Sequence, residues 1–137
     1  MTRALIAYVG AAIVFLAMDA AWLTLTNATL YRPALAPLLT DHPRLVPAVL
    51  FYVVYLAGLV LFAVRPALRS DRWLAAVGLG AAFGFVAYAT YDLTNQATLR
   101  VWATQITVLD LAWGTFVSSV GAAAGYFAAR LAKPRPA

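Results

Sequence analysis

The sequence contains no cysteine, which excludes disulfide bonds, thiolate metal ligands and a cysteine nucleophile. It has a single histidine, His42, and no spacing typical of a metal site or of a Ser/His/Asp arrangement. A glycine-rich phosphate loop and a nucleophile elbow are missing as well. We therefore expect no metal ion and no cofactor.

Charged residues are also scarce. They account for 11% of the 137 residues, whereas apolar residues account for 64%, and water could not solvate the surface of such a chain. The net charge of +5 does not indicate a nucleic-acid partner, because the basic residues flank apolar runs instead of clustering on one helix face. The composition therefore predicts an integral membrane protein whose partner is membrane lipid.

Four apolar runs are long enough to cross a hydrocarbon core of about 30 Å, which takes about 20 helical residues. They cover residues 4–27, 46–64, 73–91 and 106–129. We predict an all-α fold, a bundle of four transmembrane helices forming one domain over residues 1–137. Residues 28–45 contain prolines and should form an irregular loop, and a short interfacial helix should begin near Thr94 or Asn95.

The basic residues predict the orientation of the bundle. Two groups of basic residues lie on opposite sides of the membrane: Arg3, Arg65, Arg69, Arg72, Arg130, Lys133 and Arg135 against Arg32, Arg44 and Arg100. The larger group marks the cytoplasmic side, so both termini should be cytoplasmic.

Two small-residue motifs suit close packing of helices in lipid, Gly80-x-x-x-Gly84 in the third span and Gly121-x-x-x-Gly125 in the fourth. They predict either packing within one chain or a homodimer.

Three aspartates lie within or at the ends of the spans, where each costs roughly 2.5–3.5 kcal/mol at a bilayer centre. With the N-terminus inside, Asp19 lies about 21 Å along the first span. Asp92 ends the third span on the outer side, and Asp110 begins the fourth there. The three carboxyls should therefore lie at a similar depth in the outer half of the bilayer.

Aromatic side chains gather at the same depth, several of them one helical turn from an aspartate. An indole N–H can satisfy a carboxylate while its ring stays in lipid. The outer half can thus build a polar network or line a pocket, whereas the inner half is almost purely apolar. The candidate ligand-binding residues are Trp22, Tyr52, Tyr55, Tyr88, Tyr91, Asn95 and Trp113.

A resemblance covers nearly the whole chain. The most distinctive stretch is YATYDLTNQAT over residues 88–98, joined by MDAAWL over 18–23, FY at 51–52, RPA at 65–67 and DLAWG at 110–114. With these stretches the chain resembles the small bacterial membrane proteins of the domain of unknown function 2177 family. The resemblance implies a bacterial inner-membrane location and four spans, and it implies no particular activity.

Two interpretations of the aspartates stay open. They are either structural, bonded to tryptophan, tyrosine or a helix cap, or they converge on a cavity where they exchange protons or hold a cation. Three functions follow: a protein that binds, and as an enzyme modifies, an amphipathic lipid-like molecule; a small proton- or cation-coupled transporter; or a structural membrane subunit. In the enzyme hypothesis, Asp19, Asp92 and Asp110 are the candidate acid and base groups.

Overall fold

The computed structural model describes residues 2–40 and 42–132. Lys133 and Arg135, two of the basic residues used to predict the orientation, lie outside the described residues. Within the described part the chain forms helices and no strand, and four continuous helical segments are long and apolar enough to cross a membrane. The predicted all-α fold with four membrane spans is confirmed.

Each of the four segments is longer than the sequence predicted. The first consists of α1 (Thr2–Thr26), a π-helical turn (Asn27–Tyr31), α2 (Arg32–Leu35) and a 3-10 turn (Ala36–Leu38). The second consists of α3 (Leu45–Leu59), a second π-helical turn (Val60–Val64) and α4 (Arg65–Ser70). The third and fourth are the single helices α5 (Trp73–Thr98) and α6 (Thr104–Leu131).

The expectation of an irregular loop over residues 28–45 is wrong for its first part, and the reason lies in the π-helical turns. Each wide turn stands immediately before an Arg-Pro pair, and the arginine N–H closes it by donating to a carbonyl five residues earlier, Arg32 to Asn27 and Arg65 to Val60. A proline inside an α-helix lacks one N–H and its ring clashes with the carbonyl four residues before it. The wide turn absorbs that conflict, so the helix continues through the proline.

The separate interfacial helix near Thr94 is also not formed, because α5 continues through this polar stretch to Thr98. The threonine hydroxyls donate to carbonyls one turn back, from Thr94 to Thr90 at 2.5 Å and from Thr98 to Thr94 at 2.8 Å. These bonds let polar residues stay in the helix. Asp92 is therefore an interior residue of α5 and does not cap a new helix.

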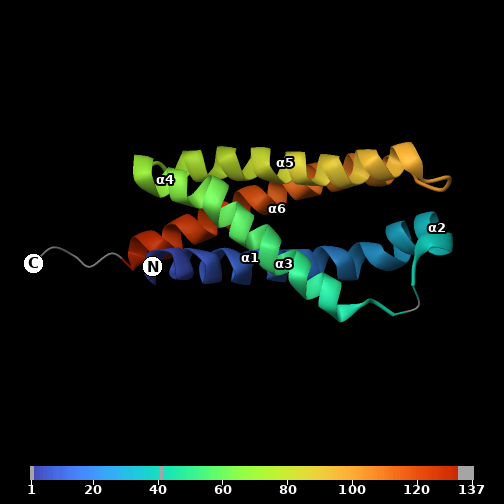
Figure 1. Cartoon of the computed structure of the whole chain (residues 1–137), viewed down its shortest axis with the longest axis horizontal. Coiled ribbons are helices and arrows are strands. Elements are labelled where there is room, and N and C mark those ends of the chain that lie inside the picture. The colour runs from blue at the N-terminus through green and yellow to red at the C-terminus, as the bar shows by residue number, and fades with distance from the viewer. Residues whose placement is uncertain (1, 41, 133–137) are drawn as a thin grey trace, which may run out of the picture.

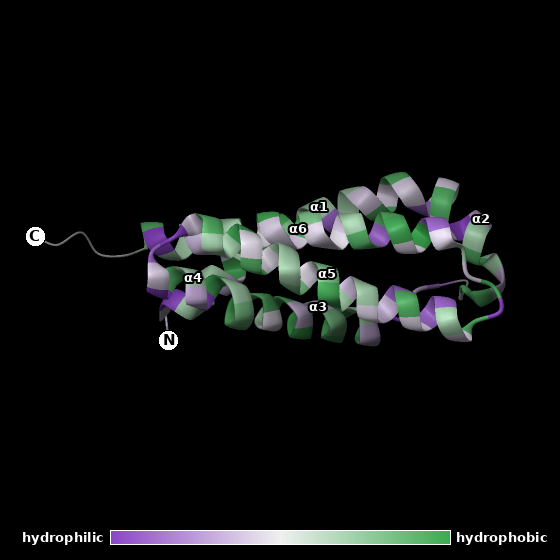
Figure 2. Ribbon diagram, turned by 90° about the horizontal axis from the view of Figure 1, so that it is seen from above, coloured by the Kyte–Doolittle hydropathy of each residue, from purple (hydrophilic) through white to green (hydrophobic). Residues whose placement is uncertain are grey.

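Helix α6 is the centre of the bundle. In its most apolar stretch of 18 residues 44% of the residues are buried, whereas the corresponding share in the other three segments is at most 22%. Helix α5 lies along one side of α6 and α1 along the other, while α3 crosses the bundle diagonally (Figure 1). The start of α1 and the end of α6 lie at the same end of the bundle (Figure 1), which we call the terminal end; the opposite end is the distal end. Hydrophilic residues gather mainly at these two ends (Figure 2).

Both small-residue motifs pack against another helix of the same chain. Gly80 and Gly84 of α5 lie against Ser118 and its neighbours on α6, and Gly125 of α6 lies against Ala7 and Ala11 of α1. These faces are therefore occupied within one subunit. A homodimer, if formed, needs a different surface.

The packing of α5 on α6 gives the first testable prediction. A Cβ built on Gly84 collides with the carbonyl oxygen of Gly114 and comes within 2.6 Å of the Ser118 Cβ, whereas a Cβ on Gly78 meets no atom within 4 Å. We expect Gly84→Ala to lower the free energy of unfolding by about 1–3 kcal/mol, as overpacking does. Gly78→Ala should be neutral or stabilise by up to about 1 kcal/mol. Thermal unfolding in detergent compares the two, and equal stability of both variants would contradict this packing.

Candidate functional site

The Asp19 carboxylate joins three helices at the distal half of the bundle. The Tyr52 hydroxyl from α3 donates to Asp19 Oδ2 at 2.5 Å, and the Trp113 indole from α6 donates to Oδ1 at 3.2 Å. Asp19 itself is only 6% exposed. Both of its oxygens therefore have a partner from another helix, which makes Asp19 a cross-link of α1, α3 and α6.

Asp110 ends a relay of hydrogen bonds that starts on α1. The Trp22 indole donates to the Tyr31 hydroxyl at 2.9 Å, and that hydroxyl donates to Asp110 Oδ1. Tyr31 lies in the first π-helical turn, which the sequence-based interpretation had placed in a loop. Tyr31 is thus a site residue that sequence reasoning missed, because helical spacing from Asp19 or Trp22 does not point to it.

Each of the two tryptophans is hydrogen-bonded, directly or through Tyr31, to the aspartate of the other helix. Trp22 lies one helical turn from Asp19 along the chain, and Trp113 lies one turn from Asp110. Each indole nevertheless points toward the acid of the other helix, Trp22 through Tyr31. The rings stack with centroids 4.5 Å apart and planes 8° from parallel. Stacking brings α1 and α6 together at this depth, and the crossed pairing then follows. The acid–aromatic cluster so formed consists of Asp19, Trp22, Tyr31, Tyr52, Asp110 and Trp113.

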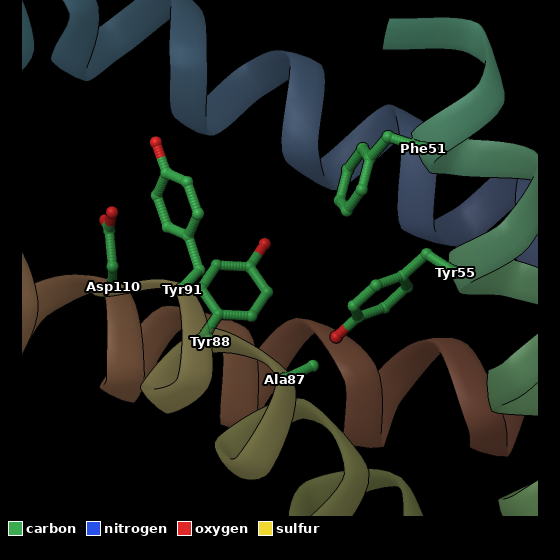
Figure 3. A pocket seen from close by; sticks show the side chains of 6 residues that line it. All are labelled: Phe51, Tyr55, Ala87, Tyr88, Tyr91 and Asp110. Atoms are coloured by element: carbon green, nitrogen blue, oxygen red, sulfur yellow. The ribbon is translucent and has the colours of Figure 1, made fainter. Parts of the chain in front are cut away.

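A cavity of about 450 Å³ lies beside this cluster, between α3 and α5, with Asp110 of α6 at one end (Figure 3). We call it the lateral cavity. It arises because α3 approaches α5 closely near Gly58 and Phe83 but diverges from it toward the distal end (Figure 1). Its lining is almost entirely aromatic and aliphatic: Phe51, Tyr55, Ala87, Tyr88, Tyr91 and Asp110.

The lateral cavity opens at the outer surface of the bundle. Phe51 and Tyr91, on opposite walls, are 46% and 60% exposed, whereas Tyr55 is buried and its hydroxyl shares a hydrogen bond of 2.7 Å with Ser118. Two shallower apolar hollows continue the cavity along the same seam. They share Phe51, Tyr55 and Ala87 with it and extend to Phe62, Phe83 and Leu79. We call the whole surface the α3–α5 groove.

Asp92 differs from the other two acids. Its side chain is fully buried, and neither carboxyl oxygen has a hydrogen-bond partner among the described residues. The residue lies one turn beyond Tyr88 on α5. A buried polar group without a partner costs several kcal/mol in an apolar medium, roughly 2–7 kcal/mol.

The structure places the predicted site residues in different surroundings. Asp19, Trp22, Tyr52 and Trp113 belong to the acid–aromatic cluster, and Tyr55, Tyr88 and Tyr91 line the lateral cavity. Asp110 belongs to both, and Asp92 is buried outside the cavity lining. Asn95 is half-buried farther along α5, and it is not among the residues that line the cavity. Of the three candidate acid and base groups, Asp110 is the one in the cavity wall. No group of three or more metal-ligating side chains occurs within residues 2–40 and 42–132.

Fold and site together define a small membrane protein with four candidate spans and with buried acids beside an apolar surface groove. The chain belongs to the family described as predicted membrane protein (DUF2177), whose model matches residues 4–127. The family that the sequence resembles is thereby confirmed. Among curated proteins and among solved structures, no match was found.

Proposed function

We propose that the protein binds an amphipathic, lipid-like molecule, with its polar end at Asp110 and its hydrocarbon tail in the α3–α5 groove. The lateral cavity carries this proposal, because it is an apolar space open to lipid that ends at a buried carboxyl. Ligand pockets typically combine an apolar lining with a few polar groups that fix orientation. The groove and Asp110 have this composition.

The apolar part of the groove suits a flexible tail. Side chains such as Leu50, Val54 and Phe62 are 58–68% exposed and line or border the seam outside the lateral cavity. A lipid tail gains little by leaving other lipid for this groove, since both surroundings are equally apolar. Selectivity must therefore come from the polar end.

The acid–aromatic cluster favours a ligand whose polar end donates hydrogen bonds. The hydroxyls of Tyr31 and Tyr52 and the indoles of Trp22 and Trp113 already donate within the cluster. Acceptor capacity is left over on Asp92 and on the second oxygen of Asp110, neither of which has a described partner. An amine or a polyhydroxylated head group in the cavity would satisfy the second oxygen of Asp110, whereas a phosphate or carboxylate would be repelled.

The same geometry disfavours a transport path through one chain. Between the lateral cavity and the terminal end, the side chains of Phe15, Leu59, Val64 and Val117 are fully buried and pack into one apolar core. Among the described residues this core contains no charged side chain, and its buried polar groups are hydroxyls such as that of Ser118, so a proton or cation would find no carboxylate along it. Binding, with acid–base modification of the bound molecule as its extension, fits the site better than transport.

The location belongs to the same proposal. We place the protein in the bacterial inner membrane with its terminal end in the cytoplasm, since Arg3, Arg65, Arg69, Arg72 and Arg130 all belong to that end. The acid–aromatic cluster then lies in the outer half of the bilayer.

Filling the cavity tests the proposal. We expect protein purified in mild detergent to carry a lipid-like molecule visible by native mass spectrometry, and Ala87→Phe to reduce its occupancy by roughly tenfold, about 1.4 kcal/mol. Ala87 lines the cavity, whereas Ala57 is exposed on α3, so Ala57→Phe is the matched control and should keep the occupancy of the parent. A parent without a bound molecule, or equal occupancy in Ala87→Phe, would show that the groove is not a binding site.

A further inference from the structure

A second cavity, of about 280 Å³, lies at the terminal end of the bundle between the first turn of α1 and α4. Its lining is Arg3, Ala4, Arg65, Leu68 and Arg69. Three of these five residues are arginines, and the other two provide an apolar floor. This basic cavity lies far from the acid–aromatic cluster and is independent of the function proposed above.

The arginines converge from two parts of the chain. Arg65 and Arg69 are four residues apart on α4, so they lie on one helix face, and Arg3 approaches from α1. Helix α4 is held in place by Ala67, which is fully buried. Like charges at this spacing repel each other, and an anion held between them would remove the repulsion.

No carboxylate among the described residues neutralises the basic cavity. Asp71, at the same end, is engaged elsewhere: the Arg130 guanidinium lies 3.4 Å from its Oδ1, and the Tyr126 hydroxyl donates to it at 3.2 Å. The other described acids, Asp19, Asp92 and Asp110, belong to the distal half. The three positive charges thus remain available to a ligand.

We propose that the basic cavity binds the phosphate of an anionic phospholipid. Guanidinium groups match phosphate oxygens with two parallel hydrogen bonds, and basic pockets between membrane helices suit lipid head groups. The cavity lies where the first candidate membrane span begins and the second ends, and lipid head groups are expected at such ends.

Retention of defined lipids tests the assignment. Delipidated protein is mixed with equal phosphatidylglycerol and phosphatidylcholine, and bound lipid is counted by native mass spectrometry. We expect the parent to bind more phosphatidylglycerol than phosphatidylcholine. In the double variant Arg65→Gln/Arg69→Gln the ratio of the two bound lipids should fall roughly fivefold. Arg72→Gln changes an exposed arginine at the same end that does not line the cavity, and it should behave as the parent does.

Two further arms separate this site from general charge effects. Inorganic phosphate should not displace phosphatidylglycerol; full displacement would assign the cavity to free phosphate instead. Arginine residues also influence the orientation of a protein in the membrane. A topology reporter fused after Ala137 therefore checks that each variant keeps the orientation of the parent. The pair Arg65→Lys/Arg69→Lys keeps the charge but not the two-pronged contact, and its preference should fall roughly twofold. An unchanged preference in the Lys pair, or an equal loss in Arg72→Gln, would overturn the proposal.

Discussion

Replacement of Asp19 by Asn should destabilise the folded chain by about 1–3 kcal/mol. Tyr52 and Trp113 both donate to this carboxylate from other helices, at 2.5 Å and 3.2 Å. An amide has a single acceptor oxygen, so its NH₂ group would face one of these donors in a site that is only 6% exposed. Thermal unfolding in detergent, followed by tryptophan fluorescence or circular dichroism, measures the loss.

Two comparisons show whether the lost stability comes from the cross-link. Asp71→Asn alters an exposed carboxylate paired with Arg130, and it should change stability by less than about 1 kcal/mol. In a double-mutant cycle, Tyr52→Phe should cost much less in the Asp19→Asn background than in the parent, because the hydrogen bond is already impaired. Strict additivity of Tyr52→Phe and Asp19→Asn would mean that Asp19 does not bind Tyr52 in the folded protein.

The number of spans could be predicted from the sequence because it depends on the length of apolar runs alone. The helix ends could not, because polar and proline residues near them are accommodated by local bonding. Thr94 bonds back to the helix carbonyl of Thr90, and the turn closed by Arg32 precedes Pro33. Neither the threonine hydrogen bonds nor the π-helical turn can be recognised from the hydropathy of the segment. The helices therefore extend beyond the predicted limits of the apolar runs, while their number, four long apolar helices, agrees with the prediction.

The meeting of Asp19 and Asp110 with aromatic side chains in one half of the bundle could be predicted, because position along each helix decides which residues lie at the same level. The partners could not be predicted. Helical spacing relates Trp22 to Asp19 on α1, yet the Asp19 carboxylate accepts from Trp113 of α6. Which side chains meet depends on how α1 and α6 are rotated about their axes, and small residues such as Gly125 against Ala7 set that rotation. Spacing within one helix contains no information about it.

The three aspartates looked equivalent in the sequence and differ in the folded chain. Asp19 has both oxygens bonded, Asp110 has one bonded and lines the lateral cavity, and Asp92 has none bonded among the described residues. The structural interpretation therefore suits Asp19. The binding interpretation suits Asp110, which lines the lateral cavity. Replacement of Asp19 should therefore lower stability, whereas replacement of Asp110 should weaken ligand binding.

Asp110→Asn should weaken binding of a cationic amphiphile by roughly tenfold or more while the chain stays folded. Hexadecylamine is a suitable probe, because its ammonium group donates hydrogen bonds and accepts none. Its hydrocarbon tail also suits the apolar α3–α5 groove. In a lipid-exposed cavity the attraction between ammonium and carboxylate is weakly screened, so loss of the charge is worth at least about 1.4 kcal/mol. Asn keeps the shape of the side chain and an oxygen that can still accept from Tyr31, which spares the relay.

Binding of hexadecylamine, measured by fluorescence quenching of the stacked Trp22 and Trp113 pair in detergent, distinguishes the interpretations. Hexadecyl phosphate, which has the same tail and the opposite charge, should bind much more weakly to the parent chain. Asp71→Asn removes a carboxyl at the terminal end and should leave amine binding unchanged. If Asp110→Asn binds the amine as tightly as the parent, or if amine and phosphate bind equally, the tail alone determines binding. Asp110 would then belong with Asp19 among the structural acids, its bond to Tyr31 serving only to hold α6 against the first helical segment.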